Sequence, residues 1–270
     1  MFRTLLHMKH RPAFIVFVLF YSFVCARVHG QVESKADEKK NTGKQFKNII
    51  RYDLSGGLFM NFSRYIVFGY ERVLNKNQSF SINVGPVALP EASKERSLIN
   101  DFTLRNNTRS NGFNVSVDYR FYLAKENRHA VPRGIYLGPY MSYNKFFRES
   151  VWNYTSAGVP DKTINTTLDM KIFSLGGELG YQFVLWKRMA IDILLIGPGI
   201  ANYTLDLTAS SNLSDEEKER LGRAVKRVIT ERYVGLNYIL SNKEFDQEGT
   251  IRTWGLGYRY IIHLGYLFGK

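Results

Sequence analysis

Cysteine is almost absent from this chain. The one cysteine, Cys25, lies inside an N-terminal segment that has the features of an export signal. A mature chain without that segment has no thiol, which excludes disulfides, cysteine-ligated metals and cysteine nucleophiles. The residue before Cys25 is Val24, which is not a small residue, so we do not expect a lipoprotein-type anchor.

Histidine is also scarce. Beyond the export signal the chain holds His129 and His263, with His29 added if cleavage leaves it in place. No two of these are spaced to share a metal ion. The pairs Gly56-Gly57 and Gly176-Gly177 fall inside predicted strands, without the strand–loop–helix context of a phosphate-binding loop. We therefore expect no metal and no cofactor.

The chain has no apolar run long enough for a spanning helix. Ala13–Ala26 is apolar and follows Arg3, Lys9 and Arg11, which is the pattern of a secretory signal peptide. Cleavage could follow Ala26 or Gly30, and an uncleaved membrane anchor is the alternative. We expect residues 1–30 to be the signal and 31–45, which are polar and free of aromatics, to be a disordered leader.

The positive charge has no nucleic-acid pattern. Removing the four cations of residues 1–30 lowers the formal net charge from +13 to +9. No Lys/Arg cluster recurs along one helix face, so we expect no nucleic-acid partner. Attraction to anionic lipid headgroups or surface polysaccharide suits an exported chain better.

The chain does contain long stretches in which apolar residues alternate with small or polar ones. From Trp254 to Phe268 every second residue is apolar or aromatic, and the residues between are mostly small or polar. A period of two predicts a β-strand with two unlike faces. The stretch exceeds a typical strand of about 5–6 residues and suits a tilted membrane strand, which needs about 9–11 plus a margin. The 17 Tyr and 19 Phe suit a barrel with aromatic girdles.

Eight such strands are predicted. They cover about Lys47–Leu58, Tyr65–Leu74, Ser79–Gly85, Gly112–Leu123, Gly134–Phe146, Leu168–Leu185, Met189–Leu205 and Arg252–Phe268. Alternation is weakest in the seventh strand, where Leu194 and Ile196 break the pattern.

The predicted connections alternate in length. Those after strands two, four and six are short or modest, whereas Leu89–Asn111, Phe147–Thr167 and Asp206–Ile251 are long and polar. Tight turns at one end and long loops at the other are typical of an outer-membrane barrel. In the last loop Ser214 and Glu217 fit a capping box, so we expect a helix over about 214–236. Its apolar stripe could dock on a partner or lipid, but packing against the barrel's own rim is the favoured interpretation.

The polar faces of the strands carry charges of both signs together with many glycines. Charges that pair inside a narrow barrel would satisfy one another, and small residues belong where space is short. We therefore expect an interior polar network with a structural role, and the apolar faces turned to lipid. It is centred on Arg51, Asp53, Glu71, Asp118, Arg120, Glu178 and Arg259, with His263 on the same face.

Three segments resemble strands of the small outer-membrane β-barrel proteins of Bacteroidota: Phe46–Tyr52, Val117–Leu123 and Pro132–Pro139. The final strand, with Tyr266 and Phe268, is similar to the C-terminal signal that the barrel-assembly machinery recognises, although Gly269 and Lys270 follow the aromatic residue. The resemblance implies fold and location, since such families are mostly of unknown function.

The expected fold is therefore all-β: an eight-stranded antiparallel up-and-down transmembrane β-barrel over residues 46–270, with a helix in the last extracellular loop. We expect a monomer of the outer membrane that contacts its lipids, is not an open pore, and has a structural or surface-interaction role towards an unknown partner of the long loops. A lipid-modifying barrel enzyme using His263, and a secreted soluble lipid-binding barrel, are the alternatives.

Overall fold

Eight strands in chain order form a closed antiparallel barrel in the computed structural model, which describes residues 46–56, 64–89, 101–123, 130–156, 159–210, 213–232 and 236–269. The elements are β1 (Asn48–Asp53), β2 (Phe68–Asn75), β3 (Gln78–Pro86), β4 (Phe102–Tyr122), β5 (Gly134–Ser156), β6 (Val159–Leu185), β7 (Met189–Ala209), α3 (Asp215–Arg232), α4 (Leu236–Leu240) and β8 (Thr250–Phe268). The predicted signal and leader, and His129, lie outside the described residues.

The last strand closes the ring. β8 pairs with β7 along its length and with β1 from Asn48↔Phe268 to Asp53↔His263. Each remaining strand pairs with its neighbours in sequence, as in an up-and-down meander. No described helix is long and apolar enough to cross a membrane.

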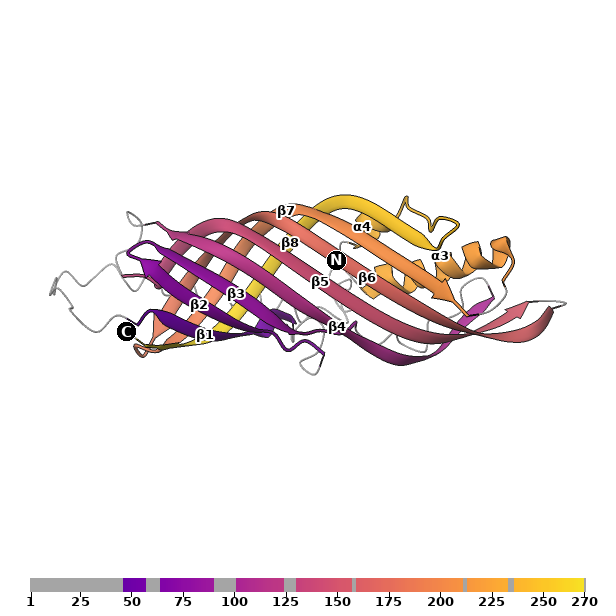
Figure 1. The fold of residues 1–270 in the computed structure, drawn as a ribbon, viewed down its shortest axis with the longest axis horizontal. Coiled ribbons are helices and arrows are strands. Elements are labelled where there is room, and N and C mark those ends of the chain that lie inside the picture. The colour runs from indigo at the N-terminus through magenta and orange to yellow at the C-terminus, as the bar shows by residue number, and fades with distance from the viewer. Residues whose placement is uncertain are drawn as a thin grey trace, which may run out of the picture. The chain divides into compact units, whose positions relative to one another are not determined.

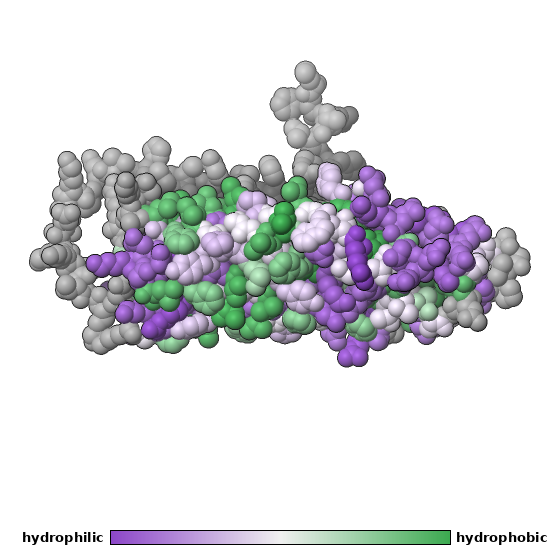
Figure 2. Space-filling view, turned by 45° about the horizontal axis from the view of Figure 1, so that its top comes forward, coloured by the Kyte–Doolittle hydropathy of each residue, from purple (hydrophilic) through white to green (hydrophobic). Residues whose placement is uncertain are grey.

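The two faces of the wall have the orientation that the alternation predicts. Ile82 and Val84 of β3 expose 40% and 56% of their surface, whereas the charged Arg51, Glu71 and Arg120 expose 2% or less. Figure 2 shows hydrophobic residues gathered over the middle of the barrel wall and hydrophilic residues beyond them. The apolar faces therefore point outward and the charges point into the lumen.

The strands differ greatly in length, which divides the molecule into two parts. β1, β2 and β3 have 6, 8 and 9 residues, whereas β4 to β8 have 19 to 27. We call the part where all eight strands pair the closed half. The open half is the extension of β4–β8 beyond Pro86 and Asp53, which Figure 1 shows running past the three short strands.

The open half corrects two predicted loops. Residues 147–156 and 159–167 are paired strand residues of β5 and β6, which pair as far as Ser156↔Val159. Residues 102–111 of the first long predicted loop belong to β4. The first strand, by contrast, ends early, because residues 54–56 are helical. β2 begins at Phe68, and Tyr65 forms only an isolated bridge with Val87.

The polarity of the wall reverses in the open half, which explains why its strands have the sequence character of loops. In β5, Leu137 and Met141 point outward in the closed half, but Trp152 and Tyr154 point inward in the open half and are buried. Charged residues such as Glu149 take the outward positions there. The period of two continues, but the apolar residues move to the other face.

The helices fill the concave side of the open half. Leu221, Val225 and Ile229 recur along one face of α3 and are buried in one cluster with residues of β4–β8, and Leu236 and Leu240 of α4 belong to it too. The predicted helix is thus present as α3 and buries its own stripe against the strands. The capping box forms as expected: Glu217 Oε2 accepts from the Ser214 backbone N–H (2.8 Å), and Ser214 Oγ accepts from the Glu217 backbone N–H (3.3 Å).

Candidate functional site

The centre of the closed half is built around the guanidinium of Arg51 on β1. Arg51 pairs across the sheet with Gly69 on β2 and with Gly265 on β8. A Cβ on Gly69 would lie 2.8 Å from Arg51 Nε, so glycine is needed for the arginine to cross the lumen. Arg51 then donates to Asn83 (3.1 Å), Ser81 (2.5 Å) and three carboxylates, those of Glu71 (3.3 Å), Asp192 (3.2 Å) and Asp118 (3.5 Å).

Arg120 on β4 is the second centre. It donates to Asp118 (2.8 Å), Glu71 (3.3 Å), Asp192 (2.9 Å) and Gln182 (3.1 Å). Its guanidinium carbon lies 4.3 Å from the centroid of the Tyr136 ring. Because the two arginines share three carboxylates, neither can be removed without leaving buried charge uncompensated.

Asp192 on β7 joins the parts of this cluster. It lies on the polar face that the alternation predicts, but it is not among the residues on which the predicted network is centred. Besides both arginines it accepts from Tyr136 Oη (2.7 Å) and lies 3.0 Å from His263 Nδ1. A register shift between Leu194 and Gly197 interrupts the β7–β8 pairing just beyond it. That bulge accounts for the break in the alternation at Leu194 and Ile196.

Arg259 completes the cluster from β8. It donates to Glu178 (3.3 Å) and Ser116 (3.2 Å) and lies 3.6 Å from Asp118. We call the joined group the ionic plug: Arg51, Arg120, Arg259, Glu71, Asp118, Glu178, Asp192 and His263. Three guanidiniums face four carboxylates, so one further bound proton, on His263 or a carboxylate, would balance the charges.

Asp53 was predicted in this network but lies beside it. Its carboxylate accepts from the backbone N–H and the hydroxyl of Ser55 (2.9 and 2.5 Å) and from Tyr65 Oη (3.3 Å). β1 ends at Asp53, and the chain turns at 54–56, so the carboxylate caps that turn and does not reach the arginines. The other seven predicted residues all belong to the plug.

Interior glycines are paired with interior tyrosines. A Cβ on Gly176 would lie 2.7 Å from the Tyr140 ring and 2.2 Å from the Pro198 carbonyl, and one on Gly180 would lie 2.3 Å from Tyr136 Oη. The neighbouring Gly177 faces outward, where a Cβ would meet nothing closer than 3.9 Å. The glycines on the polar face therefore make room for large luminal side chains, as expected in a narrow barrel.

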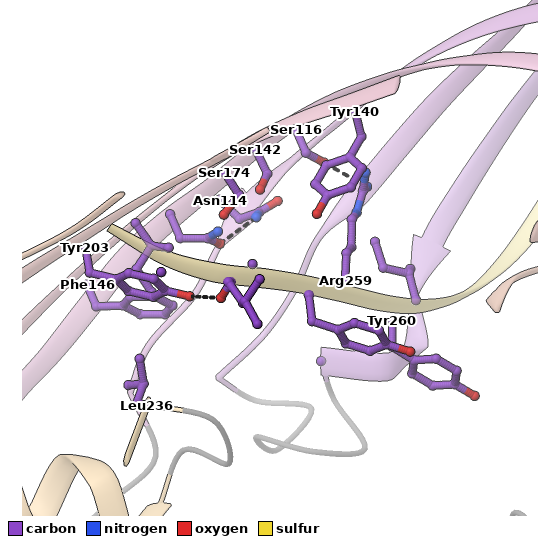
Figure 3. Close-up of a pocket in the computed structure, with 18 of the residues that line it drawn as sticks. Asn114, Ser116, Tyr140, Ser142, Phe146, Ser174, Tyr203, Leu236, Arg259 and Tyr260 are labelled. Carbon is purple, nitrogen blue, oxygen red and sulfur yellow. Dashed lines mark hydrogen bonds between the residues drawn. The ribbon is translucent and has the colours of Figure 1, made fainter. Parts of the chain in front are cut away.

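A cavity of about 810 Å³ borders the plug at Arg259 and His263 and extends into the open half. One wall carries hydroxyls and amides that lie together in Figure 3: Asn114, Ser116, Ser142 and Ser174. Asn144 also lines this wall and accepts a hydrogen bond from Asn114 Nδ2 (2.6 Å). The rings of Phe146 and Tyr203 lie next to this wall, and Leu236 of α4 borders the far end. The cavity therefore has a neutral polar wall, an aromatic side and a charged floor.

The chemistry available to His263 is limited. Its hydrogen bonds within the described part of the chain go to Asp192 alone, and Nε2 is buried without a partner there. No group of three or more His, Cys, Asp or Glu side chains among the described residues could hold a metal ion.

No protein-family model matches the chain, and no curated protein matches it. Two solved structures have partial similarity to this chain. The CarO protein of Acinetobacter baumannii has 10% identity, with 83% of this chain and 98% of that chain covered at a TM-score of 0.36. A major outer membrane protein of Thermus thermophilus has 9% identity, with 83% and 100% covered at a TM-score of 0.32. At these values the likeness does not extend to an activity or a ligand.

Proposed function

We propose that this chain is an integral outer-membrane β-barrel with a sealed lumen, whose open half serves surface interaction. The observation that carries the proposal is the contrast between the two faces of the closed half. Large apolar side chains cover its outside, and the ionic plug fills its inside. A soluble barrel would need the opposite arrangement, with an apolar interior. A lipid bilayer stabilises this one.

The outward residues also suggest where the hydrocarbon ends. On the outside of β6 and β7, Phe173 and Ile200 are among the last apolar residues before the open half. The next outward positions towards the open half, two residues away on each strand, are the polar Lys171 and Asn202. Lys171 lies 3.2 Å from Asp206, so charges pair on this outer surface. The short strands β2 and β3 have the length that a bilayer requires, about 9–11 residues with adjoining turn residues. The open half would therefore project beyond the membrane.

Orientation follows from the connections. Tight turns lie at the end of the barrel that holds the start of β1 and the end of β8, as expected on the periplasmic side. The open half with α3 and α4 would then face the outside of the cell. On the resemblance of its strands we place the chain among the small outer-membrane barrels of Bacteroidota type, inserted by the barrel-assembly machinery through its final strand and working as a monomer.

Electrophoresis of unboiled and boiled samples tests the barrel directly. A lipid-embedded barrel should require detergent for extraction and should migrate differently before and after boiling. Release into buffer without detergent, with no change on boiling, would refute the membrane assignment.

Planar-bilayer recordings test the sealed lumen. The plug draws side chains from β1, β2, β4, β6, β7 and β8 into the lumen, so we expect no steady channel conductance. Stable ohmic steps from the unmodified protein would contradict this part of the proposal.

Lipid analysis after overexpression separates a scaffold from a lipid-modifying enzyme, the alternative role. We expect an unchanged lipid profile, because the ring of His263 is held by Asp192 and belongs to the plug. A new lipid species that disappears in His263→Gln would favour the enzyme.

A further inference from the structure

We propose that the turn end of the closed half binds anionic phospholipids of the leaflet around it, through cations that have no carboxylate partner. We call these cations the basic rim: Lys47, Arg72, Lys76, Arg133, Lys187 and Arg188. The inference rests on the membrane location and orientation proposed above, which make this leaflet the periplasmic one. It goes beyond them by naming a lipid class and its site.

The basic rim lies where the tight turns join the strands. Lys76 lies in the turn between β2 and β3, and Lys187 and Arg188 lie in the turn between β6 and β7. Lys47 directly precedes β1, and Arg133 directly precedes β5. Figure 1 shows this end of the barrel, where β1 starts and β8 ends, opposite the end that carries α3. The six cations therefore gather at one level around the barrel.

No carboxylate side chain of the described residues shares this surface. The described carboxylates of the closed half all lie inside, with 4% or less of their surface exposed: Asp53, Glu71, Asp118, Glu178 and Asp192. Outside the described part, the sequence of residues 31–45 has four cations against three acids, and that of 124–129 has two against one. Neither segment is net negative, so the sequence offers no acidic counterpart to the basic rim.

Cations on the outside of β5 and β6 differ, because they have carboxylate partners. Lys145 lies 3.1 Å from Asp169, and Lys171 lies 3.2 Å from Asp206. No member of the basic rim forms an ion pair within the part of the chain that the structure describes. The positive charge of the basic rim is therefore left for a group outside the chain.

Arg188 is oriented by uncharged groups. Its Nη1 donates to Tyr266 Oη (2.6 Å), and its guanidinium carbon lies 5.0 Å from the centroid of the Phe46 ring. The Arg188 carbonyl accepts from the Leu267 backbone N–H (2.7 Å), which holds the turn beside β8. Because Tyr266 points outward, the guanidinium lies over the outer surface of β8. It keeps its charge and has further N–H groups to donate to a ligand.

Arg72 is held in a similar way on β2. Its Nη1 donates to Asn48 Oδ1, which also accepts from Tyr70 Oη (2.6 Å). Asn48 pairs with Arg72 on one side and with Phe268 on the other. Neighbouring strands lie about 4.8 Å apart, so the three spacings from β7 to β2 put the two arginines within roughly 15 Å of each other. They therefore lie on the same side of the barrel.

Aromatic side chains indicate that the basic rim lies at the level of the lipid headgroups. Trp186 shares the turn of Lys187 and Arg188 and is 83% exposed, and the outward Tyr70 and Tyr266 are partly exposed next to the two arginines. Tryptophan and tyrosine gather where a membrane meets water. At that level a guanidinium meets phosphate groups, to which it can donate two parallel charge-assisted hydrogen bonds.

The missing carboxylates select the headgroup. A zwitterionic headgroup brings an ammonium as well as a phosphate, and the described part of the basic rim has no carboxylate to pair with that ammonium. A phosphate whose headgroup has no positive charge, as in phosphatidylglycerol, leaves no such group unpaired. Each lysine or arginine close to an anionic membrane surface strengthens binding by about fivefold.

The test uses the full barrel released from nanodiscs that contain equal amounts of phosphatidylglycerol and phosphatidylcholine with the same acyl chains. Native mass spectrometry counts the lipids that stay bound. We expect phosphatidylglycerol to be retained at least about tenfold over phosphatidylcholine. Equal retention would overturn the inference. Free glycerol phosphate is the soluble probe and should bind at least about tenfold more weakly than phosphatidylglycerol; equal binding would show a site for soluble phosphate and overturn the lipid.

Matched variants locate the site. Arg72→Gln and Arg188→Gln should each lower the preference for phosphatidylglycerol about fivefold. Lys171→Gln also removes one outward cation, but one that is paired with Asp206 near the other end, and should leave the preference unchanged. An equal loss in all three variants would overturn the site. Heat-modifiable migration of the same samples reports separately on the barrel, so an intact barrel that retains both lipids equally refutes this inference alone.

Discussion

Arg120→Met tests whether the ionic plug holds the barrel together. The substitution keeps much of the side-chain length but removes the guanidinium that contacts Asp118, Glu71 and Asp192 at 2.8 to 3.3 Å. Arg51, Arg259 and His263 would remain against four buried carboxylates. Removing one partner of a buried ion pair costs about 3–5 kcal/mol, because the other charge stays buried. We expect a loss of stability of about that size.

Urea unfolding in phospholipid vesicles, followed by tryptophan fluorescence, provides the measurement. With a urea slope of about 1–3 kcal/mol per molar, the midpoint should fall by at least about 1 M. The control is Phe121→Met, the next residue on β4, which faces lipid and keeps much of its apolar surface. It should change stability by less than about 1 kcal/mol. If both variants unfold at the same urea concentration, the plug does not stabilise the barrel and the reasoning fails.

Three further predictions concern the wall, its two faces and the helix. Gly176→Ala should lower the yield of folded barrel, seen by heat-modifiable migration, whereas Gly177→Ala should not, because only the first methyl overlaps Tyr140 and backbone; equal yields would contradict the luminal packing. In proteoliposomes, a cysteine at Ile82 should be protected from a water-soluble maleimide and one at Lys171 should react, and reaction at both would place the apolar face in water. The backbone N–H of Ser214 and the ammonium of Lys162 lower the pKa of Glu217 below its ordinary value of 4.5. Their stabilisation of α3 is therefore present above that value and lost as the pH falls through the lowered pKa. The protection of the α3 amides, taken as the intrinsic exchange rate at each pH divided by the observed rate, should fall on acidification, and less so in Glu217→Gln, which has no carboxylate to titrate; identical acid responses would exclude this residue.

The orientation of the closed half could be predicted from sequence because each side chain there obeys one rule. Every second residue is apolar and faces lipid, and the residues between are polar, small or charged and face the lumen. Arg51 and Glu71 were recognised in this way, and the structure joins them through one buried ion pair. The same rule predicts that Asp53 belongs to the network. Asp53 lies outside it because β1 ends at this residue, and the alternation does not predict where a strand ends.

The open half escaped prediction because its surroundings change along a single strand. In β5, Met141 faces outward where Trp152, further along the same strand, faces the helices. If the apolar face is assigned to lipid throughout, no consistent face continues beyond Phe146, and the pattern indicates a loop. Side chains continue to alternate between the two faces of the strand. What changes is that water replaces lipid on the outside and that the helices become the packing partner on the inside.

The cavity could not be predicted at all, because it depends on a difference in strand length. A barrel must be closed by all of its strands within the hydrocarbon, because an unpaired strand edge is not stable there. The short strands β1, β2 and β3 complete the ring in the closed half. Beyond them, β4–β8 are long enough to continue as a curved sheet that α3 and α4 fill. The five long strands therefore belong to both parts: with β1, β2 and β3 they form the closed half, and beyond those three strands they form the open half.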